Sequence, residues 1–208
     1  MQFRLAALIL PFLSLVYAQD TSLTTVKRAF EAANIPEDID IKFDPSVLLE
    51  VTFPQASGRS ITLHAGVQLP RNATAGPPTF TVRGNAGHGP FVVATVDPDA
   101  PTPQDPTEAE IRHFLGSDFF ASGGNPAPLT NRTPAISEFL QPTPPAGSDA
   151  HRYIFLLFNQ PANFDQQTVV TSNTSISGFD ISAFAKATGL GNPIAGTFML
   201  VAPDPTTA

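Results

Sequence analysis

Residues 153–158 read Tyr-Ile-Phe-Leu-Leu-Phe, a run in which no position carries a charge or an amide. Successive side chains of a strand point to opposite faces of a sheet, so a strand without a polar face has to be covered on both sides. We therefore expect residues 153–158 to form a central strand between two hydrophobic layers. The other elements have to pack around this strand.

Alternating apolar residues elsewhere in the chain predict further strands. The candidates are residues 39–43, 47–53, 61–67, 79–83, 91–96 and 197–201, and residues 111–115 also read as a strand. In that last segment alternation would place Ile111, His113 and Leu115 on one face and Arg112 on the other. Residues 116–149 are rich in Gly, Pro, Ser and Asn without clear periodicity, which predicts a long loop. The chain is thus expected to be mainly β.

Two segments have the spacing and the end signals of helices. Apolar residues at helical spacing predict a helix over residues 21–33, with Thr21 or Ser22 as its N-cap. Asp180 can cap a second helix that continues through Lys186. Phe179 and Phe184 are spaced to pack against each other across this cap as a hydrophobic staple. Gly189 stands just past the expected C-terminus, where a glycine commonly ends a helix.

The first 18 residues have the order of a secretory signal peptide. A basic start with Arg4 is followed by a short apolar stretch and by Val-Tyr-Ala ahead of polar sequence, which predicts cleavage after Ala18. The apolar stretch is shorter than the roughly 20 residues that cross a bilayer. We expect a secreted protein in which residues 19–208 form one domain.

Composition excludes several kinds of site. The chain has no cysteine, so disulfides, thiolate metal sites and a cysteine nucleophile are excluded. Its formal net charge of −7 disfavours binding to nucleic acid and to anionic membrane surfaces. Three Asn-X-Ser/Thr tripeptides predict glycosylation in a secretory pathway, at Asn72, Asn131 and Asn173.

Residues 97–101 read Asp-Pro-Asp-Ala-Pro and directly follow the candidate strand 91–96. Each proline fixes its own φ and restricts the residue before it, so Asp97 and Asp99 are held on a stiff segment that suits a site. From this pentapeptide alone, a solvent-exposed acidic turn is the favoured interpretation.

Two histidines lie in or beside candidate strands. His113 is flanked by apolar residues on its expected face, and taken alone it has the pattern of a core histidine. His151 stands where a Pro-rich loop enters the central strand, and it should share a face with Tyr153.

Taken together, the order and spacing of these motifs resemble the phosphatidylethanolamine-binding protein family. The motifs that carry the resemblance are residues 97–101, Pro106, His113-Phe114, Pro144-Pro145, residues 151–157, residues 179–185 and residues 191–196. The resemblance extends over residues 22–201. It implies a large central antiparallel sheet, a smaller sheet packed against it, and peripheral helices.

The resemblance also implies a function. Members of this family hold phosphate-like anions, including phospholipid head groups, in a small pocket, without a cofactor and without stable membrane insertion. Carried onto this chain, the ligand-binding residues would be Asp97, Asp99, His113, Pro145, His151 and Tyr153. Departures from the family pattern affect the expected head-group selectivity; they are Glu108, Ile111, Arg112 and Thr143.

Three functions remain open from the sequence. The first is a secreted, non-enzymatic protein that binds such an anion. The second is an inhibitor of a serine protease or a carboxypeptidase, which the family resemblance also implies. The third and most distant is a hydrolase that uses the Asp and His residues, since the chain has no Gly-X-Ser-X-Gly, His-Glu-X-X-His or Walker motif.

Overall fold

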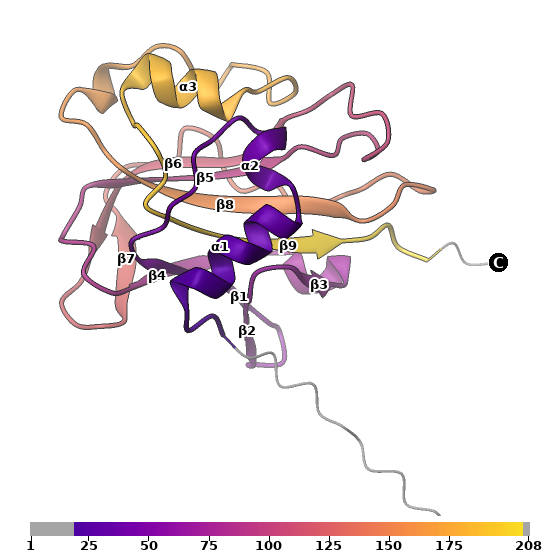
Figure 1. Cartoon of the computed structure of the whole chain (residues 1–208), viewed down its shortest axis with the longest axis horizontal. Coiled ribbons are helices and arrows are strands. Elements are labelled where there is room, and N and C mark those ends of the chain that lie inside the picture. The colour runs from indigo at the N-terminus through magenta and orange to yellow at the C-terminus, as the bar shows by residue number, and fades with distance from the viewer. Residues whose placement is uncertain (1–18, 206–208) are drawn as a thin grey trace, which may run out of the picture.

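The computed structural model describes residues 19–205, so the expected signal peptide, residues 1–18, lies outside the described part (Figure 1). The described chain forms a curled sheet with helices at its periphery. The strands are β1 (Leu48–Pro54), β2 (Ser60–Thr62), β3 (Val67–Leu69), β4 (Thr79–Arg83), β5 (Phe91–Asp97), β6 (Ile111–Ala121), β7 (Ala127–Asn131), β8 (His151–Asn159) and β9 (Ala195–Val201). The helices are α1 (Leu23–Ala32), α2 (Ile35–Asp38) and α3 (Ile181–Thr188), with short 3-10 turns at Arg71–Thr74 and Phe164–Gln166.

Strand order in the sheet is β2-β1-β4-β7-β6-β5-β8-β9-β3. Neighbours are antiparallel except β3 and β9, which are parallel. The prediction of a mainly β fold with a large sheet and a smaller packed part is confirmed. β7 pairs with both β4 and β6. It therefore joins the smaller part of the sheet (β2, β1 and β4) to the larger part (β6, β5, β8, β9 and β3) in one mixed sheet.

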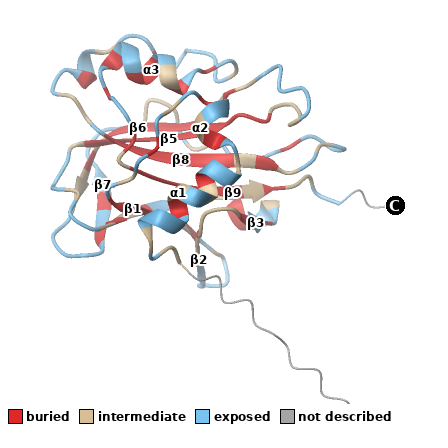
Figure 2. Cartoon of the chain, in the orientation of Figure 1, coloured by how far each residue is buried: buried red, intermediate tan, exposed pale blue. Residues whose placement is uncertain are grey.

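The sheet folds over on itself so that the smaller part covers one face of β8. Phe155 of β8 lies with its ring 6.3 Å from that of Phe53 and 6.4 Å from that of Phe80, which come from β1 and β4. On the other face, Ile154 and Leu156 belong to a hydrophobic cluster that includes residues of α1 and α3. β5 and β8 are buried along most of their length (Figure 2), so the predicted two-sided central strand is confirmed.

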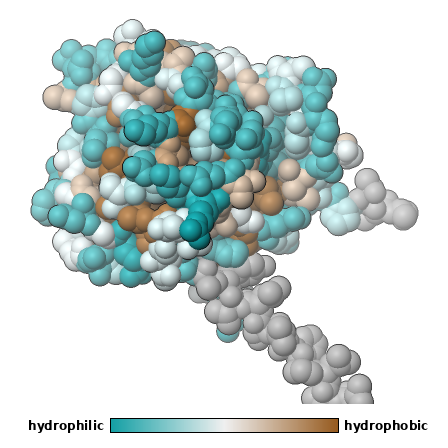
Figure 3. Space-filling model, viewed as in Figure 1, coloured by the Kyte–Doolittle hydropathy of each residue, from teal (hydrophilic) through white to brown (hydrophobic). Residues whose placement is uncertain are grey.

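Both predicted helices form with the end signals that the sequence carries. The Ser22 hydroxyl accepts a hydrogen bond from the Thr25 amide at 3.3 Å, and the Asp180 carboxylate accepts one from the Ala183 amide at 2.7 Å. Gly189 ends α3 with φ of 75°, in the left-handed region that favours glycine. The outer surface of the helix-covered face is largely hydrophilic with small hydrophobic areas (Figure 3), as expected for amphipathic helices.

Two strand predictions are wrong. Residues 39–43 form no strand: Ile39 follows α2 and Phe43 enters the core from irregular chain, so their apolar character reflects burial alone. Residues 61–67 do not form one strand: Ile61 and Thr62 end β2, which pairs with β1, and the chain turns before Val67 begins β3, which pairs with β9.

The predicted loop over residues 116–149 is also wrong in part. β6 continues to Ala121, and β7 follows within the expected loop. Alternation is hidden there because the pairing of β6 with β5 shifts register between Phe91 and Val93. Gly116 is a strand residue: a Cβ at this position would lie 2.8 Å from the ring of Phe114, so only glycine lets the ring pack there.

Glu110 is a buried acid between β6 and the start of α3. Burial raises the pKa of its carboxyl group to about 8; a hydrogen bond from the Ile181 amide opposes the rise, and the charge of Asp180 adds to it. Between the ordinary pKa of 4.5 and about 8, the native state therefore holds a proton that the unfolded state has lost. Stability falls as pH rises through this window.

Replacing Glu110 by Gln should remove this dependence, because the amide is neutral at every pH. Relative to Glu110→Gln, the wild-type free energy of unfolding should fall by about 1.4 kcal/mol per pH unit between the two pKa values. Denaturant unfolding at a series of pH values measures it. Glu37→Gln, at an exposed acid of α2, is the control and should keep the wild-type profile. Parallel profiles for wild type and Glu110→Gln would contradict the assignment.

Candidate functional site

Four of the predicted site residues meet at one end of the large part of the sheet. Asp97 is the last residue of β5, His113 lies near the start of β6, and His151 and Tyr153 lie at the start of β8. β5 is the neighbour of both other strands, which brings the three strand ends together. All four side chains are almost fully buried, with exposed fractions between 1% and 4%. For Asp97 the interpretation as an exposed acidic turn is therefore wrong.

Asp97 is the centre of this polar cluster. One carboxylate oxygen, Oδ1, accepts a hydrogen bond from the Asp99 amide at 2.8 Å. The other, Oδ2, lies 2.9 Å from Nδ1 of His151 and 3.9 Å from Nε2 of His113. Tyr153 lies beside the same carboxylate, whose charge adds to the rise that burial causes in the pKa of its phenol. The buried carboxylate thus accepts hydrogen bonds from the Asp99 amide, in the segment after β5, and from His151 of β8.

The contacts of its two ring nitrogens favour the protonated form of His151. Burial opposes protonation, but the hydrogen bond and charge of Asp97, together with Asp99 and the Pro101 carbonyl, outweigh it and raise the pKa of His151. Nδ1 donates to Asp97, and Nε2 lies 2.8 Å from Oγ of Ser148. The Ser148 hydroxyl donates its own proton to the Asp149 carbonyl, so it is free to accept from a protonated Nε2.

His113 has the opposite protonation preference. Burial lowers its pKa; the hydrogen bond to the Leu140 carbonyl and the charge of Asp97 oppose this only in part, and the neighbouring His151 adds to it. Nδ1 is 2.9 Å from the Leu140 carbonyl oxygen, which can only accept, so Nδ1 carries the proton of the neutral ring. The unprotonated Nε2 then faces Asp97, and two acceptors oppose each other across 3.9 Å.

A bulge in β6 gives His113 this orientation. Thr95 of β5 pairs with Phe114, whereas Val96 pairs with Arg112, so His113 is the extra residue. As a result His113 lies edge-on to Tyr153, with ring centroids 4.9 Å apart, while Leu115 belongs to the cluster on the opposite face. The expectation that His113 and Leu115 share a face is therefore wrong.

Tyr153 shares a face with His151, as alternation predicts. Their rings are stacked at a centroid distance of 6.4 Å. Burial raises the pKa of the Tyr153 phenol, and the nearby charge of Asp97 adds to the rise, so the hydroxyl stays protonated and serves as a donor.

Asp99 has a different role from Asp97. It is buried, so the exposed-turn interpretation is wrong here as well, and both of its carboxylate oxygens are bound by Arg152: Oδ1 at 2.6 Å from Nη2, and Oδ2 at 3.0 Å from Nε. The same guanidinium donates to the Ala33 carbonyl and to Asp38, each at 2.6 Å. Asp99 therefore holds Arg152, which joins the start of β8 to the end of α1 and to α2. Its predicted contact with a ligand stays untested.

Pro145 is exposed and belongs to the loop that runs over the cluster before β8. The sequence prediction missed Ser148 in this loop and Arg152 in β8. Arg152 stands between His151 and Tyr153, so alternation does predict that its side chain points to the opposite face of β8. Its hydrogen-bond partners could not be predicted, because they come from distant segments of the chain. Arg112, one of the departures from the family pattern, is buried against Phe179 and donates to carbonyls of residues 174 and 175.

Ser148, His151 and Asp97 form a row with the connectivity of a Ser-His-Asp triad. Two observations argue against nucleophilic catalysis by this row. A general base has to be neutral before it accepts a proton, whereas the surroundings of His151 favour its cation. In addition, the Ser148 hydroxyl donates to a carbonyl and not to the imidazole.

A comparison with protein families decides the relationship. The profile described as phosphatidylethanolamine-binding protein matches residues 56–199, more than half of the chain. The chain belongs to the phosphatidylethanolamine-binding protein family. Among its relatives, Protein FLOWERING LOCUS T of Arabidopsis thaliana is 30% identical over 161 residues, which cover 77% of this chain and 83% of the relative.

Another relative of this chain is a 26 kDa secreted antigen of Toxocara canis, 29% identical over 157 residues. The match covers 74% of this chain and 56% of the antigen. Among solved structures, a carboxypeptidase Y inhibitor complexed with its cognate proteinase superposes with a TM-score of 0.75 at 23% identity, over 88% of this chain and 97% of the inhibitor. A Plasmodium vivax phosphatidylethanolamine-binding protein gives a TM-score of 0.67 at 15% identity, over 85% and 97% of the two chains. At these identities the two structures establish the shared fold.

Two further properties concern the described part of this family member. Within residues 19–205, no group of three or more acidic or histidine side chains is arranged to hold a metal ion. Over the same residues, no helix has the length and apolar character needed to cross a membrane. The predicted glycosylation sites Asn72, Asn131 and Asn173 are all exposed, and their modification stays a prediction.

Replacing Asp97 by Asn should lower the pKa of His151 below its ordinary value, because burial then acts without the main opposing charge. The loss of a charged hydrogen bond should also cost about 2 kcal/mol of stability. An NMR pH titration of the histidine ring protons measures the pKa. Asp149→Asn changes an exposed carboxylate in the adjacent loop and should leave His151 unchanged. Equal His151 titration in the two variants would show that Asp97 does not control this ring.

Proposed function

We propose that this chain is a secreted, non-enzymatic binding protein that holds a phosphate-like anion, free or as a phospholipid head group, at the cluster of Asp97, His113, His151 and Tyr153. The observation that carries the proposal is the pair of unlike imidazoles on one buried carboxylate. His151 balances the charge of Asp97, which leaves His113 as the neutral, titratable group of the cluster.

The charge arrangement explains how an anion would be held. An anion entering beside neutral His113 meets the lone pair of Nε2, which repels it. When His113 takes up a proton, or when the anion brings its own, a hydrogen bond replaces this repulsion. Either way one proton accompanies the anion, so binding and proton uptake are linked and strengthen each other. Tyr153 and the loop that carries Pro145 would line the same space.

Three findings support the remaining parts of the proposal. The raised pKa of His151 and the hydrogen bond that the Ser148 hydroxyl donates to the Asp149 carbonyl favour binding over catalysis. One relative is described as a secreted antigen, in agreement with the signal-peptide pattern of residues 1–18. Membership in a family described by phosphatidylethanolamine binding favours a phosphate-bearing head group as ligand.

Phosphate and O-phosphoethanolamine should therefore bind more tightly as pH falls through the histidine range, by about fivefold or more from pH 7.5 to about pH 5.5. Calorimetric titration of each ligand at the two pH values measures this. His113→Gln, which keeps a side-chain donor for the Leu140 carbonyl, should lose both the affinity and its pH dependence. His88→Gln, at an exposed histidine of another turn, should behave as wild type.

Replacement of His113 suits this test better than replacement of His151, because removing His151 would leave the buried Asp97 without its counter-charge and destabilise the fold. Thermal melting of both histidine variants checks their folding. Affinities that do not change with pH in the wild type, or an equal loss in both variants, would overturn the proposal.

Protease inhibition is the second candidate, because the structure with a TM-score of 0.75 is that of an inhibitor bound to its proteinase. Hydrolysis of a peptide substrate by carboxypeptidase Y, measured with increasing amounts of this protein, tests it. If His113→Gln inhibits as wild type does, inhibition is independent of the anion site. Full protease activity at every concentration would exclude this enzyme as a target.

A further inference from the structure

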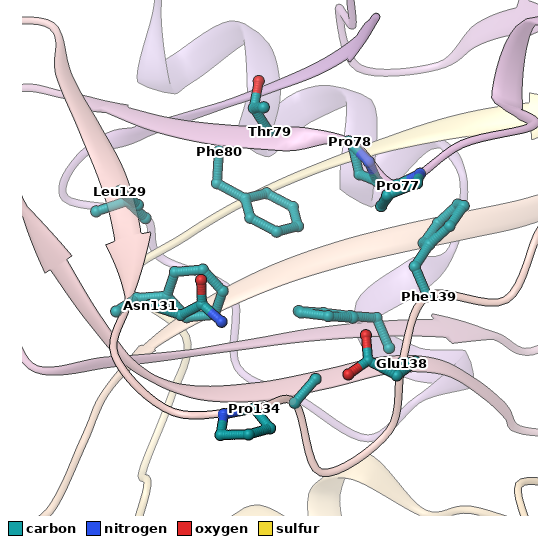
Figure 4. A pocket seen from close by; sticks show the side chains of 12 residues that line it. Pro77, Pro78, Thr79, Phe80, Leu129, Asn131, Pro134, Glu138 and Phe139 are labelled. Carbon is teal, nitrogen blue, oxygen red and sulfur yellow. The ribbon is translucent and has the colours of Figure 1, made fainter.

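A cavity separate from the polar cluster lies where β4, β6 and β7 meet the chain that follows β7 (Figure 4). Its volume is about 270 Å3. None of Asp97, His113, His151 and Tyr153 lines it. The residues that line it are predominantly aromatic, proline or aliphatic.

Phenylalanine rings form the floor of this cavity. Phe80 of β4 packs against Phe114 and Phe119 of β6, with both ring centroids 5.7 Å away. The backbone at Gly116 allows the two rings of β6 to lie this deep, since a Cβ there would come within 3 Å of each. Phe139 closes the cavity from the side of the loop after β7 (Figure 4).

One charged group lies at the rim. Among the described lining residues, Glu138 alone carries a charge, and Figure 4 shows its carboxylate turned toward the cavity. Within residues 19–205, Glu138 has no hydrogen-bond or ion-pair partner, whereas the amide of Asn131 on the opposite rim donates to the Thr133 carbonyl. An unpaired carboxylate above an aromatic floor is complementary to a positive charge attached to an apolar body.

We propose that this cavity is a binding site for a small organic cation with an aromatic body, of the arylalkylammonium class. The ring would occupy the floor between Phe80 and Phe139, and the ammonium group would lie against Glu138. A cavity of about 150 Å3 is enough to hold benzene, so 270 Å3 accommodates a phenyl ring with a short alkyl chain. The net charge of −7 adds a general attraction for cations.

Three probes of similar size separate the contributions of ring and charge: 2-phenylethylamine, 2-phenylethanol and 3-phenylpropanoate. Amide NMR titration of the full chain, prepared without N-glycans because Asn131 lies at the rim, gives both the affinity and the location of each probe. The cation should bind about fivefold more tightly than the alcohol, as expected for one partly exposed ion pair, and the carboxylate more weakly still. The shifts should centre on Phe80, Phe119 and Phe139.

Glu138→Gln should make the amine and the alcohol bind alike, while Glu31→Gln, at an exposed acid of α1, should keep the fivefold preference. Ala135→Phe places a ring in the cavity and should abolish binding of all three probes; a melting curve shows whether this variant folds. If it does not fold, the comparison of Glu138→Gln with Glu31→Gln still decides.

The proposal would be overturned by any of three results: equal affinities of the three probes for the wild type, an equal loss of preference in both Glu variants, or shifts centred on His113. Absence of binding by the amine up to about 10 mM would overturn it as well.

Discussion

Burial of β8 on both faces is the constraint on which the rest of the structure depends. A strand with Ile154, Leu156 and Phe158 on one side and Phe155 and Leu157 on the other cannot face water on either side. The helices cover one face, and the sheet has to curl so that β1 and β4 cover the other. Both hydrophobic layers, and the join through β7 that allows the sheet to fold over, follow from this requirement.

The same alternation gives neighbouring residues at the start of β8 different partners. His151 and Tyr153 point into the layer between the two parts of the sheet and meet Asp97, whereas Arg152 points to the helices and binds Asp99. Asp97 and Asp99 are thus each paired with a different basic side chain of β8. Arg152, bound to Asp99, holds the start of the strand against α1 and α2, and the Asp99 amide donates to Asp97 of the neighbouring polar cluster.

Much of the fold and most of the candidate site could be predicted from local patterns. The central strand, both helix caps and the membership of Asp97, His113, His151 and Tyr153 in one cluster follow from periodicity, from capping residues and from the family resemblance. The failures have physical causes. Residues 39–43 are apolar because they are buried, and the second half of β6, residues 116–121, was taken for a loop because a bulge interrupts its alternation. The sequence also shows two similar carboxylates, Asp97 and Asp99, but not the different partners that the structure gives them.

The sequence by itself determined where chain segments are buried, where helices begin and end, and which residues capable of acid-base chemistry stand at strand ends, because these properties depend on neighbours within a few positions. Only the tertiary structure decided the protonation preferences: Asp97 raises the pKa of His151 against the effect of burial, whereas burial lowers the pKa of His113. It also decided that the rings of Phe80, Phe114 and Phe119 meet below Glu138. Both outcomes depend on contacts between residues far apart in the chain, which no local pattern contains.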